Sequence, residues 1–276
     1  MGRGPRAALE RYRLATSAPR DAFGFRSSWR TVLGVDTHDR ASTAPRPGPP
    51  LVLVHGLAVS HRYMMPVAAE LAAFSPVHVL DLPGFGLSAD PGRVFDVAGH
   101  AAHLAAWIDA AELAPVVVLG NSFGCQVAVE LAVRFPDRVG GLVLVGPTVD
   151  PSARTASRQV LRWLRDTARE DPLQLPILAR DVRDAGPPRV AATLGHALRD
   201  PIEAKLPQVG VPLLVTRGSR EPIVPRAWAE AAARLLPAGE LAEVPGPHNA
   251  NYGAATALAG RVLAFLHERS GTRGRP

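Results

Sequence analysis

The chain has 276 residues, 47% of them hydrophobic, which is enough for one large α/β domain or two smaller ones. Its 31 basic and 25 acidic residues give a net charge of +6, but nearly all the cations are arginine and they are interspersed with acids. This scatter argues against a nucleic-acid partner. Cys125 is the only cysteine, which excludes an intramolecular disulfide.

The first 20 residues contain no apolar stretch of the kind found in signal peptides, and no uninterrupted apolar run approaches the length of a spanning helix. A single cysteine also suits a reducing compartment. We therefore expect a cytoplasmic protein with a small-molecule substrate and no membrane partner. The sequence does not indicate an oligomeric state.

In chain order, residues 1–25 are arginine-rich and aperiodic, and we expect a flexible segment there. The stretch SSWRTVLGV at 27–35 predicts a first strand. Further short apolar runs without polar alternation predict strands covered by helices on both faces, at 51–55, 77–81, 115–120, 141–146, 211–218 and 239–246.

Helical patterns separate these strands, at 61–74, 95–112, 122–135, 226–236 and 252–268. The alternation predicts βαβ units and a mostly parallel sheet. The alternation of strands and helices is interrupted at residues 151–207, which contain helical patterns and several prolines but no convincing strand. This segment is too long for an ordinary loop, so we interpret it as a helical lid. Residues 26–150 and 208–268 then form the core, and 269–276 a disordered tail.

A serine stands between two glycines in Gly120-Asn121-Ser122-Phe123-Gly124, directly after a predicted strand and before a predicted helix. A sharp turn there projects the serine oxygen, provided that its neighbours are small. The helix N-terminus also favours developing negative charge. The alternative is that Ser122 only caps the helix. The strand-turn-helix context favours a nucleophile.

A serine nucleophile needs a base, most often histidine, oriented by a carboxylate. His248 follows the last predicted strand, on the same side of the sheet as Ser122, and is the candidate base. His55 ends the strand at 51–55, and we interpret it as orienting the next loop. The backbone N–H of Leu57 or Ala58, with that of Phe123, would form an oxyanion hole.

These residues resemble the α/β-hydrolase fold superfamily from about residue 28 to residue 268. The pieces that carry the resemblance are LVLVHGLAVSHRY, VLDLPGFGLS, VVVLGNSFGCQVAVELA, GLVLVGPTVDP, VTRGSREPIVP and VPGPHNANY. The resemblance implies a mainly parallel eight-stranded sheet flanked by helices, a lid after the sixth strand, and a nucleophile, acid, base order along the chain.

The sequence alone leaves two candidates for the carboxylate that orients His248. The superfamily usually carries Gly-x-x-Asp after the seventh strand, where this chain has Glu221 after Gly218, Ser219 and Arg220. Some members carry the acid after the sixth strand, where this chain has Asp150. We favour Glu221 and keep Asp150 as the alternative, since Asp150 is also well placed to cap the following turn.

The expected activity is that of a serine hydrolase, which cleaves a carboxylic ester, lactone or thioester through an acyl-enzyme on Ser122. We expect Ala58, Phe123 and Trp163 to line an apolar substrate pocket. A serine at this turn argues against haloalkane dehalogenase and epoxide hydrolase chemistry, because those relatives use an aspartate there.

Three alternatives remain: carbon–carbon bond hydrolysis, suggested by similarity of GNSFG to meta-cleavage-product hydrolases; a non-hydrolytic cyclase or lyase; and a ligand-binding protein that retains the hydrolase shell. No cofactor is expected. No metal site is expected either, because His, Asp and Glu do not cluster at ligand spacings along the sequence.

Overall fold

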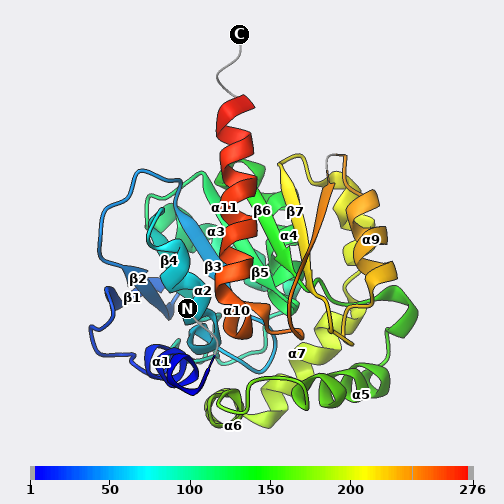
Figure 1. Cartoon of the computed structure of the whole chain (residues 1–276), viewed down its shortest axis with the longest axis horizontal. Helices are drawn as coiled ribbons and strands as arrows, with labels where there is room; N and C mark the ends of the chain where they lie inside the picture. The colour runs from blue at the N-terminus through cyan, green and yellow to red at the C-terminus, as the bar shows by residue number, and fades with distance from the viewer. Residues whose placement is uncertain (1–3, 238, 273–276) are drawn as a thin grey trace.

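The computed structural model describes residues 4–237 and 239–272. An eight-stranded sheet in the order β1-β2-β4-β3-β5-β6-β7-β8 forms its centre (Figure 1). The β1/β2 and β2/β4 pairs are antiparallel, and all the other pairs in the sheet are parallel. The expected α/β fold is confirmed. The strands are β1 (Phe25–Val32), β2 (Val35–Ser42), β3 (Leu51–Val54), β4 (Val77–Leu80), β5 (Val116–Asn121), β6 (Val139–Val145), β7 (Leu213–Gly218) and β8 (Gly239–Val244).

Helices cover both faces of this sheet. On one face lie α1 (Pro5–Ala15), α2 (His61–Leu71), α10 (Ala250–Gly253) and α11 (Ala255–Thr272). On the other lie α3 (Val97–Ala110), α4 (Phe123–Arg134), α8 (Ile202–Lys205) and α9 (Arg226–Arg234). Successive residues of β3 and β5 point alternately into the two apolar cores, which explains why these strands are continuously apolar.

Both ends of the chain contain more helix than the sequence suggested. Residues 5–15 form α1 where we expected a flexible segment, because Pro5 starts the helix and Leu14 and Ala15 are buried beside α2. The many arginines in this segment hid the short apolar face of the helix in the sequence pattern. At the other end α11 continues to Thr272, four residues into the expected tail of 269–276, and residues 273–276 lie outside the described part of the chain.

The strand expected at 27–35 is the first arm of a hairpin. It ends at Val32, because Leu33 and Gly34 both adopt left-handed backbone angles, with φ of 48° and 78°. The chain then returns as β2, which the sequence analysis did not locate. The residues of β2 are largely polar, yet His38 and Arg40 are fully buried.

Between β6 and β7 the chain forms α5 (Ala156–Thr167), α6 (Gln174–Ala185), α7 (Pro187–Arg199) and α8. In Figure 1 α5, α6 and α7 lie below the sheet, on the side where β5 hands over to α4. No helix within residues 4–237 and 239–272 is long and apolar enough to cross a bilayer.

Candidate active site

Ser122 occupies a strained turn between β5 and α4. Its φ is 53°, in the left-handed region that residues other than glycine rarely adopt. The flanking glycines are required by close backbone contacts: a Cβ on Gly120 would lie 2.4 Å from the oxygen of Gly124, and one on Gly124 would lie 2.4 Å from the oxygen of Val54. The turn is held by a hydrogen bond of 2.9 Å from Ser122 N to Val145 O.

His248 and Glu221 meet beside this turn. Nδ1 of His248 donates a hydrogen bond to Oε1 of Glu221, and the other carboxylate oxygen accepts the N–H of Gly218 at 3.0 Å. Both side chains are almost fully buried. Nε2 of His248 has no hydrogen-bond partner within the described chain, and His248 lines the same cavity as Ser122. Ser122 and His248 therefore line the same cavity, and Glu221 is hydrogen-bonded to the other ring nitrogen of His248.

Asp150, the alternative acid, has other partners. Its Oδ1 accepts the backbone N–H of Ser152 at 2.9 Å, and its Oδ2 pairs with Arg162 at 2.8 Å. It caps the turn after β6 and ties it to α5. The contact with His248 is made by Glu221.

The surroundings of His248 favour its protonated form. Burial would lower the pKa of this imidazole, but the charge of Glu221 and the hydrogen bond to it, with further contributions from Asp166 and Glu170, raise it from 6.5 to about 9.

The loop after β3 faces the turn that carries Ser122. The N–H of Gly56 donates to the hydroxyl of Tyr63 at 2.7 Å, and that hydroxyl donates to Oδ1 of Asn121, next to Ser122. Tyr63 thus joins the loop to the turn that carries Ser122. The sequence analysis missed it, because a tyrosine in a helical pattern gives no functional signal.

His55 lies beneath the same loop. Its Nε2 accepts the N–H of Leu82 at 3.0 Å, so Nδ1 carries the proton and donates to the carbonyl of Gly56 at 2.7 Å. Burial lowers the pKa of His55, which favours this neutral form. The geometry suits an orienting residue. Leu57 and Ala58 follow, and both line the cavity at Ser122.

The cavity at Ser122 has a volume of about 340 Å³. Ala58, Phe123 and Trp163, the residues expected in the pocket, all line it. Most of its other walls are apolar, contributed by Leu57, Val59, Val149, Val160, Leu175, Ile177, Leu178, Val182, Val190, Leu194, Ala197 and Ile223. Among its lining residues in the described chain there is no arginine or lysine.

One corner of the cavity is acidic. Asp166, on α5, accepts the backbone N–H of His248 at 3.1 Å, and Glu170 accepts that of Asn249 at 2.7 Å. Burial and the neighbouring charge of Asp166 raise the pKa of Glu170 to about 8. The sequence analysis did not single out these two carboxylates, because nothing along the chain relates them to a histidine about 80 residues away.

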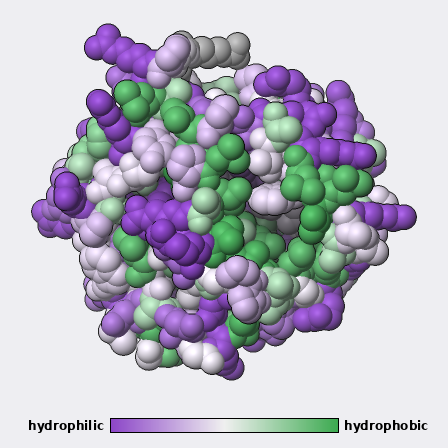
Figure 2. Space-filling model, turned by 90° about the horizontal axis from the view of Figure 1, so that it is seen from below, coloured by the Kyte–Doolittle hydropathy of each residue, from purple (hydrophilic) through white to green (hydrophobic). Residues whose placement is uncertain are grey.

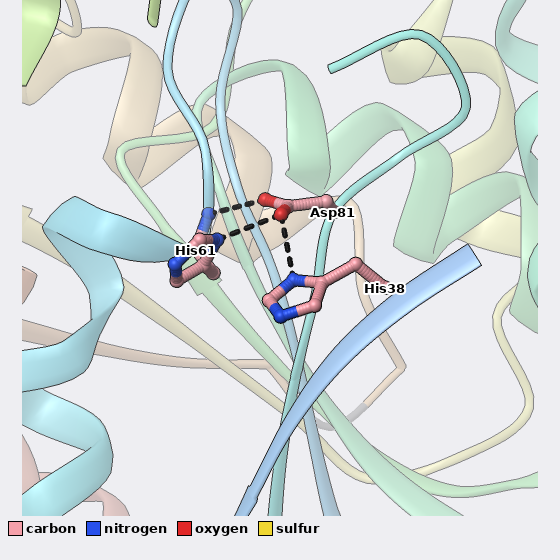
Figure 3. A group of neighbouring side chains, drawn as sticks. All are labelled: His38, His61 and Asp81. Atoms are coloured by element: carbon pink, nitrogen blue, oxygen red, sulfur yellow. Dashed lines mark hydrogen bonds and ion pairs between the residues drawn. The ribbon is translucent and has the colours of Figure 1, made fainter. Parts of the chain in front are cut away.

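A second group of polar side chains lies outside the cavity lining. Figure 3 shows His38 from β2, His61 from the start of α2 and Asp81 after β4. The sequence analysis expected no such cluster, but the fold brings three potential metal ligands within 4.8 Å of one another. Their separation in sequence hid them.

The distances within this cluster are those of hydrogen bonds. Nδ1 of His38 and Nδ1 of His61 lie 2.8 and 2.7 Å from Oδ2 of Asp81, closer than the roughly 3.3 Å between ligand atoms around a tetrahedral zinc ion. Asp81 also accepts the N–H groups of His61 and Leu87. The cluster therefore fixes the N-terminus of α2, and with it the end of the loop that faces Ser122.

The chain is similar to several known hydrolases. A family model described as alpha/beta hydrolase fold matches residues 49–177. The chain is 42% identical over 106 residues to 2-hydroxy-6-oxo-2,4-heptadienoate hydrolase of Pseudomonas putida F1, an alignment that covers 36% of this chain and 37% of that protein. It is 30% identical over 193 residues to haloalkane dehalogenase of Mycolicibacterium paratuberculosis, covering 67% of this chain and 63% of that protein. The chain thus spans less than two thirds of either relative.

Solved structures agree over nearly the whole chain. A membrane phospholipase A described as a bacterial virulence factor superimposes with a TM-score of 0.79 and 21% identity, covering 98% of this chain and 94% of that one. An esterase from Thermogutta terrifontis gives a TM-score of 0.74 and 23% identity, covering 88% and 98%. The chain therefore has the α/β-hydrolase fold, and residues 49–177 are similar to the family of that description.

Proposed function

We propose that this protein is a serine hydrolase that cleaves a carboxylic ester, lactone or thioester of a largely apolar small molecule through an acyl-enzyme on Ser122. One observation carries the proposal: the strained turn presents Ser122 to a cavity that His248 also lines, while Glu221 holds the far side of the imidazole. This is the arrangement that serine hydrolases on unrelated folds share.

In this mechanism neutral His248 accepts the proton of Ser122 at Nε2 as the serine oxygen attacks the substrate carbonyl carbon. Glu221 keeps the Nδ1 proton in place and stabilises the imidazolium that forms. The backbone N–H groups of Leu57 and Phe123 would hold the oxyanion. The imidazolium then protonates the leaving oxygen or sulfur, and water attacks the acyl-enzyme with His248 again as base, releasing the acid and free Ser122.

The charge of the cavity supports an uncharged or cationic substrate. Asp166 lies beside His248, and no described lining residue carries a permanent positive charge. A substrate carboxylate bound there would lose water and lie near Asp166, with no arginine or lysine of the lining to pair with it. Thus the arginines of α5 do not make this cavity a site for acidic substrates.

The second candidate is carbon–carbon bond hydrolysis. It is favoured by the 42% identity over 106 residues to the heptadienoate hydrolase and by the GNSFG turn. The acidic corner argues against it, because a dienoate substrate is itself a carboxylate. We therefore rank ester-type hydrolysis first.

We also propose that residues 151–207 act as the lid of this site. Gln159, Trp163 and Asp166 from α5 and Leu178 from α6 form cavity walls opposite Ser122. Because the core supplies the reacting groups and this insertion most of the remaining wall, the insertion would select the substrate.

The test is a fluorophosphonate probe together with a panel of neutral p-nitrophenyl esters, lactones, acyl thioesters and a dienoate. We expect labelling of the wild type, none of Ser122→Ala, and a loss of ester turnover in that variant of at least about a thousandfold. Turnover retained by Ser122→Ala would refute the acyl-enzyme mechanism and leave the cyclase or lyase alternative open. Absence of labelling in the wild type would indicate a ligand-binding protein, and a preference for the dienoate would favour the second candidate.

A further inference from the structure

The outward surface of α5 is unusually apolar for a solvent-facing helix. Large apolar side chains on α5 and at the start of α6 are between two fifths and just over half exposed: Val160 at 44%, Leu161 at 49%, Trp163 at 40%, Leu164 at 55% and Leu175 at 50%. They account for five of the eleven exposed large apolar residues in the described chain. We call this set the α5 apolar strip.

Arginines flank the strip on the same helix. Arg158 and Arg165 are two helical turns apart, and Arg169 continues their line just past the end of α5. Within the described residues none of the three has a carboxylate at salt-bridge distance. We call these three the arginine line.

The outward face of α5 carries no negative charge to balance this line. The only acidic residue of α5 is Asp166, which is buried beneath the helix against the loop of His248. Arg162, on the inner side, is already paired with Asp150. The exposed residues of α5 are therefore apolar or cationic apart from Ser157, and none of them is acidic.

The strip is continuous with the mouth of the cavity. Val160, Trp163 and Leu175 belong to the strip and also line the cavity at Ser122. Figure 2, seen from below, shows hydrophobic side chains gathered around a hollow on this face. Whatever covers the strip would thus lie at the entrance of the proposed active site.

We propose, against the expectation of no membrane partner from the sequence, that the α5 apolar strip and the arginine line dock the protein on the surface of an anionic lipid bilayer. Amphipathic helices with leucine and tryptophan on one side and arginine beside them lie in the plane of a membrane interface, with the apolar side chains below the headgroups and the cations among the phosphates. The helix α5 would lie on the bilayer without crossing it, and the cavity mouth would open toward the lipid.

Charge complementarity favours this occupant over a second copy of the chain. A twofold contact would place the same patch on both sides of the interface. The arginine lines would then approach each other with no carboxylate on α5 to neutralise them. Lipid phosphates supply that charge.

Co-sedimentation with vesicles tests the proposal without relying on catalysis. The probes are phosphatidylcholine vesicles with and without about 30 mol% phosphatidylglycerol, at about 50 mM and about 500 mM salt. We expect binding to the anionic vesicles at low salt, much weaker binding to the neutral ones, and loss at high salt. Ser122→Ala should bind like the wild type, so failure of the proposed hydrolase activity would leave this result unaffected.

Surface variants identify the docking face. Leu161→Ser combined with Leu164→Ser should weaken binding at least about tenfold, since burial of two leucine side chains is lost. Arg158→Gln combined with Arg165→Gln should weaken it by about twenty-fivefold, at about fivefold for each charge. The matched control is Leu33→Ser, at an apolar residue that is 72% exposed in the β1–β2 turn, and should have no effect.

Three outcomes would overturn the proposal. They are no binding to anionic vesicles at low salt, equal loss of binding in the Leu33 control, and a dimer in solution that the Leu161→Ser and Leu164→Ser pair converts to monomer. Circular dichroism of each variant, all at exposed positions, checks that the fold is intact.

Discussion

Replacement of Glu221 by Gln tests the assignment of the orienting acid. Glutamine keeps the size of the side chain and can still accept the N–H of Gly218, which the carboxylate accepts at 3.0 Å. It removes the negative charge next to Nδ1 of His248. The amide can also present its own N–H to the ring, which would turn the imidazole into the wrong tautomer.

The expected loss follows from the pKa of His248. The rise from 6.5 to about 9, for which Glu221 provides the largest favourable contribution, corresponds to about 3 kcal/mol of preferential stabilisation of the imidazolium. In the proposed mechanism the imidazolium also forms in the transition state. Losing this stabilisation should lower kcat by about a hundredfold, and the wrong tautomer would increase the loss.

The assay is ester hydrolysis from about pH 6 to about pH 10. In the wild type, kcat/KM should rise with pH as His248 loses its proton, with a midpoint above 7 and toward 9. In Glu221→Gln the residual activity should have its midpoint at lower pH. The matched control is Asp150→Asn, which should stay within about threefold of the wild type because Asp150 contacts Ser152 and Arg162 instead. A near-normal Glu221→Gln with an inactive Asp150→Asn would refute the reasoning.

Two further predictions concern the supports of the site. Tyr63→Phe leaves the buried N–H of Gly56 without its partner, so kcat should fall about tenfold while probe labelling persists, and an unchanged kcat would show that the loop needs no such anchor. Arg62→Gln leaves Asp181 buried without its ion pair and should lower the free energy of unfolding in urea by about 3 kcal/mol. The exposed Arg26→Gln should change it by less than about 0.5 kcal/mol, and equal effects of the two would contradict the argument.

The sequence predicted the central strands well because their environment is uniform. β3 and β5 are buried on both faces, so an apolar run is the only pattern compatible with their positions. Ser122 was identifiable for a similar reason, since its conformation requires Gly120 and Gly124 close by in the sequence. Features determined by local backbone geometry leave a local signature.

Features determined by contacts between distant segments left no such signature. β2 has a polar sequence, and it is buried because His38 meets Asp81 and Arg40 meets the serines at 17 and 27. The choice between Glu221 and Asp150 depended on which carboxylate the β7 loop or the β6 loop brings to His248. Only the folded structure contains this information.

The charged groups around His248 come from both the core and the insertion at residues 151–207. Glu221 and His248 both belong to the core and follow β7 and β8, so their contact is a property of the sheet. Asp166 and Glu170 come from the insertion and accept hydrogen bonds from the backbone N–H groups of the loop that carries His248. Replacement of Asp166 or Glu170 should therefore change both the lining of the cavity and the pKa of His248. Under the proposed mechanism, substrate preference and pH dependence should vary together among variants of α5, while variants elsewhere on the surface should change neither.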